Sequence, residues 1–121
     1  MKVLIVESSP DLGRVWQGHM ERQGMDVCLS TDQASAVNAL NTKAFDVIIL
    51  DLVLERGSAI AVADLACYRY PEAQVIFVTN TGFFSDGSIF ELSVNARALI
   101  QSDTPPEDLT AMVEHCGRQL A

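Results

Sequence analysis

Residues 45–54 read Phe45-Asp-Val-Ile-Ile-Leu-Asp51-Leu-Val-Leu54, and this stretch is the best guide to the fold. Within it, residues 46–50 form a short run that is apolar after its first residue and ends against the acid Asp51. Short apolar runs bounded by polar or turn residues are typical of strands that are buried on both faces of a sheet. We therefore predict a central strand here, with Asp51 directly after it.

Similar runs occur at intervals along the chain. Three lie at residues 2–6, 74–78 and 97–100, and a weaker one lies at residues 25–29. The stretches between them are amphipathic, have the length of helices and open with helix-start residues. We expect helices that begin at Ser9, Ser30, about Ser58, Ser85 and Thr104.

Two of these helix starts carry a capping-box pattern. Ser30 is followed three residues later by Gln33, and Thr104 is followed three residues later by Glu107. Strand and helix signals alternate five times from one end of the chain to the other. This alternation predicts an α/β fold with a doubly wound, five-stranded parallel sheet and helices on both of its faces.

Length and composition favour one folding unit. The chain has 121 residues, of which 49% are apolar and 20% are charged. A chain of this size buries roughly two-thirds of the surface that its unfolded form exposes, which supplies a full core. We therefore expect a single domain over residues 1–121 that folds without disulfide bonds or a structural metal.

Charge and cysteine content exclude several classes of protein. The 16 acidic residues outnumber the 8 basic ones, giving a net charge of −8, so binding to nucleic acid or to an anionic membrane is not expected. Cys28, Cys67 and Cys116 show no metal-binding spacing, which indicates reduced core thiols in a cytoplasmic protein. The first apolar run ends at Glu7 and is too short for a secretion signal or a membrane span.

Polar residues follow the apolar runs. Glu7 and Ser8 follow the first, Asp51 the third, Thr79 the fourth and Ser102 the fifth. Ligands of an open parallel sheet bind outside the carboxyl ends of its strands. Acids at neighbouring strand ends can hold a hard cation through their oxygen atoms, and a threonine hydroxyl can donate to an anion beside it. The layout therefore indicates phosphate chemistry.

Four ordered motifs carry a resemblance to a known family. They are Val3-Leu-Ile-Val-Glu-Ser-Ser-Pro10, the stretch 45–54, Val75-Ile-Phe-Val-Thr79 and Asn95-Ala-Arg-Ala-Leu-Ile-Gln-Ser-Asp-Thr-Pro-Pro-Glu-Asp-Leu109. In this order and spacing they resemble the receiver domain of two-component response regulators. The resemblance implies a flavodoxin-like (βα)5 receiver fold and a function in two-component signal transduction.

The resemblance also implies roles for individual residues. Asp51 would be the phosphoacceptor, the nucleophile that takes a phosphoryl group, and Thr79 would donate a hydrogen bond to a phosphoryl oxygen. The implied cofactor is Mg²⁺, with Glu7, Asp51 and the backbone carbonyl of Val53 as its ligands.

The partners implied by the resemblance are proteins. A sensor histidine kinase or a phosphotransfer protein would supply the phosphoryl group. A downstream protein would bind the face formed by the helix at 85–95, the strand at 97–100 and the last helix, 104–120. Phe83, Phe84 and Phe90 could add apolar surface there. The sequence leaves open whether two copies of the chain form a homodimer.

The chain departs from the family pattern at the site. Family members usually carry a second acid where this chain has Ser8, and a lysine where it has Ser102. A hydroxyl supplies no charge, and a charge-assisted hydrogen bond contributes roughly 1.5–3 kcal/mol. Asn80 replaces a small residue, and Leu99 replaces an aromatic one that changes rotamer on activation. We therefore interpret the chain as an atypical receiver, although losing one acid and one lysine leaves the net charge of the metal-free pocket unchanged.

Alternative functions stay open beside the leading one. The leading interpretation is protein–protein signalling that depends on phosphorylation of Asp51. The alternative is a phosphorylation-independent pseudo-receiver, a constitutive protein-interaction module, which the missing acid and lysine favour. We do not expect an enzyme, because a phosphohydrolase with an aspartyl nucleophile would need a second aspartate at position 53.

Simpler roles are also available to the candidate residues. Asp51 could cap a neighbouring helix, and Glu7 could be a solvated acid rather than a metal ligand. Ser8 and Ser9 are typical of a helix start and not of a nucleophile. His19 and His115 fall within expected helices, away from the strand ends, and are given no role.

Overall fold

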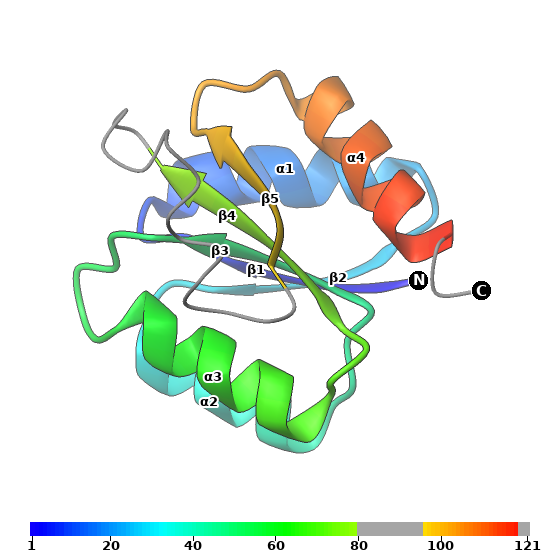
Figure 1. Ribbon diagram of the computed structural model, residues 1–121. Coiled ribbons are helices and arrows are strands. Elements are labelled where there is room, and N and C mark those ends of the chain that lie inside the picture. Colours follow the sequence, from blue (N-terminus) through cyan, green and yellow to red (C-terminus); the bar gives the residue numbers. More distant parts are fainter. Residues whose placement is uncertain (80–95, 119–121) are drawn as a thin grey trace.

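The apolar runs of the sequence form a parallel sheet in the computed structural model, which describes residues 1–79 and 96–118. Its strands are β1 (Lys2–Val6), β2 (Asp26–Ser30), β3 (Val47–Asp51), β4 (Gln74–Thr79) and β5 (Ala96–Gln101). They pair in parallel in the order β2-β1-β3-β4-β5, and their carboxyl ends lie at the left in Figure 1. This is the flavodoxin-like order and confirms the predicted fold class.

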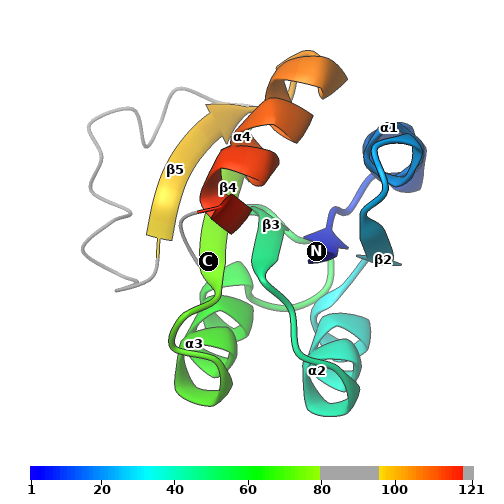
Figure 2. The same ribbon diagram turned by 90° about the vertical axis from the view of Figure 1, so that its right-hand side faces the viewer.

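Helices cover both faces of the sheet. The described helices are α1 (Pro10–Arg22), α2 (Gln33–Thr42), α3 (Ala59–Arg69) and α4 (Pro106–Arg118). Figure 2 shows α1 and α4 on one face and α2 and α3 on the other. The expected helix at 85–95, Asn80 and the three phenylalanines at 83, 84 and 90 lie outside the described residues, as does the expected end of the last helix at 120.

Successive residues of the central strands supply two separate cores. Leu4 and Val6 of β1 pack in the cluster that holds the buried side chains of α2 and α3. Val3 and Ile5 pack in the opposite cluster, with Trp16 of α1 and buried residues of α4. All four strand side chains are fully buried, and burying an aliphatic side chain of this kind contributes about 1.5–3 kcal/mol. A strand buried on both faces therefore has to be apolar at each buried position, as β1 is from Val3 to Val6.

Two helix starts agree with the sequence prediction. Ser9 is the N-cap residue of α1, although its side chain makes no capping hydrogen bond, and Pro10 occupies the first helical position. Ser58 is the N-cap residue of α3, where its Oγ atom accepts a hydrogen bond from the Ala61 amide at 3.2 Å. Helix α3 ends at Arg69, close to the end expected before Pro71.

The predicted start of the second helix is wrong. Ser30 does not cap α2, because it completes β2 and its carbonyl accepts the Glu7 amide at 3.0 Å. The N-cap residue is Asp32, whose Oδ1 atom accepts the Ser35 amide at 2.8 Å and the Ser35 hydroxyl at 2.7 Å. These bonds, first of all the one from the amide, lower the pKa of Asp32. The helix starts later because strand pairing takes up Ser30.

The predicted capping box of the last helix is also not formed. The Thr104 hydroxyl donates to the carbonyl of Gln101 at 2.7 Å. It therefore closes the turn after β5 instead of capping α4, which begins at Pro106. A hydroxyl can satisfy a nearby carbonyl as readily as a helix amide, so the sequence pattern left both outcomes open.

The cysteines follow the prediction in part. All three lie among the described residues and form no disulfide, but only Cys116 is buried, whereas Cys28 and Cys67 are half-buried. Over residues 1–79 and 96–118, no helix combines the length and the apolar content that crossing a membrane requires.

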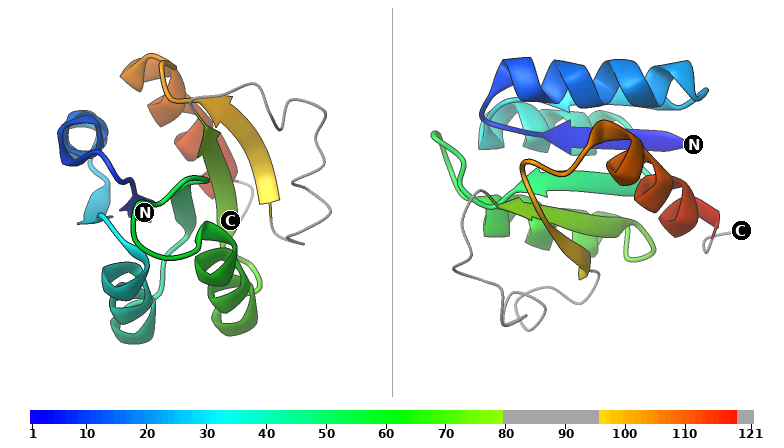
Figure 3. Two further views of the ribbon diagram at one scale, coloured as in Figure 1. Left: turned by 90° about the vertical axis from the view of Figure 1, so that its left-hand side faces the viewer. Right: turned by 90° about the horizontal axis from the view of Figure 1, so that it is seen from above.

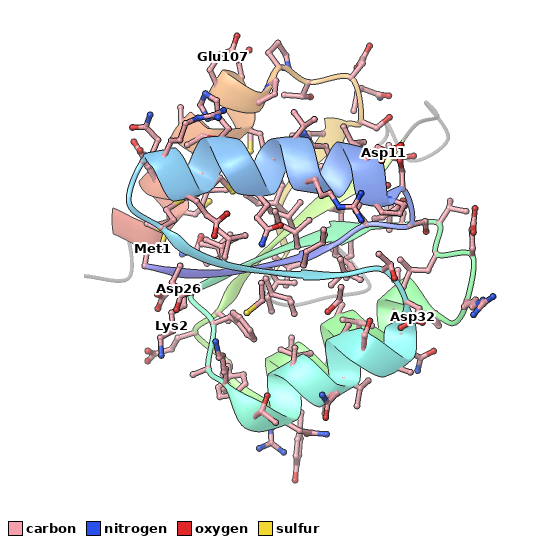
Figure 4. The ribbon with its side chains drawn as sticks, turned by 180° about the vertical axis from the view of Figure 1, so that it is seen from behind. Met1, Lys2, Asp11, Asp26, Asp32 and Glu107 are labelled. Atoms are coloured by element: carbon pink, nitrogen blue, oxygen red, sulfur yellow. The ribbon has the colours of Figure 1, made fainter. Side chains whose placement is uncertain are left out.

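The two ends of the strands carry different groups of residues. In Figure 4, Asp11 and Asp32, at the beginnings of α1 and α2, lie at one end, and Met1, Lys2 and Asp26 lie at the opposite end. At the end with Met1, the Asp26 amide donates to the Met1 carbonyl at 2.9 Å and starts the pairing of β1 with β2. The opposite end holds the carboxyl ends of the strands and the amino ends of α1 and α2, so a ligand site is expected there.

Candidate functional site

The register of the sheet brings two acids together. β1 and β3 are neighbours, and Val6 is paired with Leu50. The next residue on each strand is an acid, Glu7 on β1 and Asp51 on β3. Figure 3 (left) looks onto the carboxyl ends of the strands, where the loop that follows β3 crosses toward α3. The structure therefore places the predicted acids at adjacent strand ends.

Backbone amides hold the carboxylate of Asp51. Its Oδ1 atom accepts the Val53 amide at 3.0 Å, and its Oδ2 atom accepts the Ser8 amide at 3.4 Å. The side chain is half-buried and lies beside β4, where Val78 is the strand partner of Asp51. The carboxylate thus has a defined orientation, and the residue keeps part of its surface exposed. It does not cap a helix, which was the simpler alternative.

Glu7 is an almost fully buried acid. Only 5% of its surface is exposed. Its Oε1 atom accepts the Ser9 amide at 3.2 Å, whereas its Oε2 atom is buried and has no hydrogen-bond partner. Burial raises the pKa of Glu7 from 4.5 to about 7; the Ser9 amide opposes this rise, and the neighbouring Asp51 charge adds to it. Glu7 is therefore not the solvated acid of the simpler interpretation.

Ser8 does not contribute to a helix start, contrary to the sequence prediction. Its hydroxyl donates to the backbone carbonyl of Val53 at 3.0 Å and accepts the Glu55 amide at 3.1 Å. A hydroxyl can do both because it is one donor and also an acceptor. Ser8 therefore connects the end of β1 to the β3–α3 loop, residues 52–58. Its position after Glu7 was visible in the sequence, but nothing there indicated this contact.

The donor set of the expected magnesium site can be compared with what the metal needs. Mg²⁺ takes oxygen ligands, commonly one or two carboxylates, and keeps several waters. The Glu7 and Asp51 carboxylates meet this need, and the unpartnered Glu7 Oε2 atom is free to face a cation. The Val53 carbonyl already accepts the Ser8 hydroxyl. Among the described residues no group of three or more His, Cys, Asp or Glu gathers, so the donors fit an ion held by two carboxylates.

Thr79 and Ser102 lie on the other side of Asp51. Thr79 is the last residue of β4, one position beyond the partner of Asp51, and only 1% of its surface is exposed. The Ser102 amide donates to the Thr79 carbonyl at 2.8 Å. The position at which the lysine was expected is thus next to the site, and a half-buried serine occupies it. On the β4 side of Asp51 this position therefore carries a serine and supplies no positive charge.

Comparison with known proteins connects this geometry to one family. Residues 3–114 match the family described as the response regulator receiver domain. Comparison of the sequence with curated proteins finds no significant match.

Solved structures of low sequence identity share the fold. A CheY-like receiver domain from Methanospirillum hungatei JF-1 is 19% identical with a TM-score of 0.88, over 98% of this chain and 94% of that one. The receiver domain of the Francisella response regulator 1452 is 18% identical with a TM-score of 0.85, over 99% and 98% of the two chains. NtrX from Brucella abortus, solved with ATP, is 21% identical with a TM-score of 0.88, over 98% of this chain but only 27% of NtrX.

Proposed function

This chain belongs to the response regulator receiver domain family, and from that membership we propose that it signals by accepting a phosphoryl group on Asp51. Receiver domains of two-component systems interact with histidine kinases or phosphotransfer proteins, generally bind Mg²⁺ at the phosphorylation site, and generally act as signalling modules and not as enzymes. We propose that residues 1–121 form one such domain, in the cytoplasm, with Asp51 as its phosphoacceptor.

One observation carries the proposal. The Asp51 carboxylate is half-buried at the end of a central strand, held by two backbone amides and placed beside the buried acid Glu7. An acid with a merely structural role would not need a second acid at the adjacent strand end, because two close carboxylates repel each other. A pair of this kind is instead suited to share a cation.

The chemistry follows from these positions. An oxygen of Asp51 attacks the phosphorus of a phosphohistidine in line; the new O–P bond forms as the N–P bond breaks, and its electron pair returns to the imidazole. The Val53 and Ser8 amides orient the carboxylate during the attack. Glu7 and Asp51 would hold Mg²⁺, which when bound neutralises charge on the phosphoryl oxygens. We assign Thr79 the hydrogen bond to one of those oxygens.

We further propose that the phosphorylated domain binds a downstream protein. Among the described elements, we assign this contact to the face formed by β5 and α4. The Ser102 amide, directly after β5, donates a hydrogen bond to the carbonyl of Thr79. A shift of Thr79 would therefore move the end of β5, which belongs to this face.

A second candidate function is supported by one specific contact. The Ser8 hydroxyl already holds the Val53 carbonyl, and Ser102 stands where a lysine was expected. Both features favour a pseudo-receiver that binds its partner without phosphorylation.

An NMR titration separates the two candidates. Amide spectra are recorded with Mg²⁺ and then with beryllofluoride, a mimic of the phosphoryl group on aspartate. The leading proposal expects shifts at Asp51 and Thr79 that spread to α4 and vanish in Asp51→Asn. Asp11→Asn, at an exposed acid on α1, serves as the control and should respond like the unmodified protein. No response at millimolar magnesium and mimic leaves the pseudo-receiver.

A further inference from the structure

The β3–α3 loop is tied down near both of its ends. At its far end, the Gln33 amide donates to the Arg56 carbonyl at 3.1 Å, and the Gln33 Oε1 atom accepts the Ser58 amide at 2.8 Å. Both bonds involve Gln33, which is the first residue of α2. The end of the loop that leads into α3 is therefore held by a helix on the same face of the sheet.

The end of the loop next to Asp51 is held by Ser8. The Ser8 hydroxyl uses its donor on the Val53 carbonyl and its acceptor on the Glu55 amide. The Ser8 amide donates to Asp51 Oδ2, and the Val53 amide donates to Asp51 Oδ1. Ser8 thus contacts both the carboxylate and the loop segment whose amide holds that carboxylate.

We propose that Ser8 is a positioning residue whose hydroxyl fixes the β3–α3 loop beside Asp51, so that this loop keeps its shape without a metal ion. The inference deepens the proposed function, because the loop it concerns carries the Val53 carbonyl and amide of the expected phosphorylation site. It also explains how the chain can lack the second acid and still hold this loop by hydrogen bonds.

The chemistry of the side chain decides this role. An ionised carboxylate at position 8 could accept the Glu55 amide but could not donate to the Val53 carbonyl, because it has no hydrogen to give. An ionised carboxylate and a carbonyl oxygen that face each other repel, and a cation between them removes this repulsion. Serine replaces that requirement with a direct hydrogen bond, and alanine would supply neither partner.

Amide exchange of the loop tests the proposal in EDTA, without metal or phosphate mimic. In Ser8→Ala, the Glu55 amide should exchange roughly two- to twelve-fold faster, the factor that corresponds to a typical hydrogen bond. Ser8→Thr keeps a hydroxyl and should restore the slow rate. Ser9→Ala is the matched control, since the neighbouring Ser9 side chain makes no capping bond, and its Glu55 rate should equal that of the unmodified chain.

A fourth variant gives a readout that a purely structural serine would not change. In Ser8→Asp, the exchange rate of the Glu55 amide should depend on Mg²⁺, whereas in the unmodified chain it should be the same in magnesium and in EDTA. Because a carboxylate at position 8 can still accept the Glu55 amide, the Ser8→Asp variant is judged by its magnesium dependence and not by its rate in EDTA alone. The proposal is overturned if Ser8→Ala leaves the Glu55 rate unchanged, or if Ser8→Asp gives the same Glu55 rate in magnesium and in EDTA. Because the main arm needs neither phosphorylation nor metal, a negative beryllofluoride result would contradict the proposed function and leave the Ser8 inference standing.

Discussion

Glu7 and Asp51 lie side by side at the ends of neighbouring strands, yet only Glu7 is almost fully buried, and one of its oxygens has no hydrogen-bond partner. The two carboxylates therefore differ in how they meet their need for hydrogen-bond donors. Asp51 has a backbone amide for each oxygen, whereas Glu7 has one amide for two oxygens. An acid in that position favours its protonated form.

We expect the free energy of unfolding to fall as pH rises from about 4.5 to about 7. The folded-state pKa of Glu7 is raised from 4.5 to about 7, so the folded protein binds the proton more tightly than the unfolded chain. The contribution is complete below pH 4.5 and is lost as pH rises through 7. Since one pKa unit corresponds to ~1.4 kcal/mol, the loss is on the order of 3 kcal/mol. Urea unfolding at several pH values measures it.

Glu7→Gln provides the control for this pH dependence. Glutamine keeps an oxygen that can accept the Ser9 amide but does not ionise. The variant should show a flatter profile between pH 4.5 and 7 and should exceed the unmodified protein in stability at pH 8. Parallel profiles for the two proteins would assign the pH dependence to other groups.

We expect Ser8→Asp to bind Mg²⁺ more tightly than the unmodified chain. The substitution adds a third carboxylate to two that already face each other, and Mg²⁺ binds through carboxylate oxygens. A gain of about tenfold in affinity corresponds to ~1.4 kcal/mol. NMR titration with magnesium measures the change. Ser9→Asp adds the same charge one residue later, and an equal gain there would show that general electrostatics and not ligation is responsible.

Gly57→Ala should destabilise the protein. Gly57 has a φ of +102°, and a Cβ atom at this position would contact the Gln33 side chain, which holds the loop. Left-handed backbone costs a non-glycine residue roughly 1–2 kcal/mol, before any clash. Gly18→Ala is the matched control, because Gly18 lies inside α1 with open space around it. That variant should gain about 0.5–1 kcal/mol, and chemical denaturation compares both.

Asp32→Ala should lower the free energy of unfolding, because the substitution removes an N-cap side chain that accepts a helix amide. Asp32 accepts both the amide and the hydroxyl of Ser35. Asp11→Ala removes an exposed acid from the first turn of α1, where its contact with Arg14 is a 3.6 Å surface ion pair. That control should change stability by less than ~0.5 kcal/mol. Equal effects from both variants would contradict the assignment of Asp32 as the cap.

Strand positions could be predicted because burial on both faces leaves a continuous apolar run. The run before Asp51 identified β3, and the parallel arrangement then required Glu7 and Asp51 to meet. Charge counting was less informative. It indicated that the paired loss of one acid and one lysine leaves the local net charge unchanged, but it could not show that Glu7 is buried with an unpartnered oxygen. Burial of one polar side chain depends on packing around it and not on the pattern of its neighbours.

Short polar side chains were the hardest to assign. Ser8, Ser30 and Thr104 all sit in sequences typical of helix starts, and all three do something else in the fold. Each can donate to or accept from any backbone group within reach. Which group that is depends on the tertiary structure, so the sequence alone could identify Ser8 as a departure from the family pattern but not as a contact of the loop.

The order of the sheet sets where the domain opens first. β1 and β3, which end in the two acids, each have a strand on both sides, whereas β2 and β5 form the edges. Local opening in native proteins starts from the elements with the fewest partners, and central strands open last. We therefore expect the amides of the edge strands β2 and β5 to exchange before those of β1 and β3, so that the acid pair stays assembled while an edge strand opens. The edge that we assign to a downstream partner and the acid pair that we propose receives the phosphoryl group would then belong to different cooperative units of the same small fold.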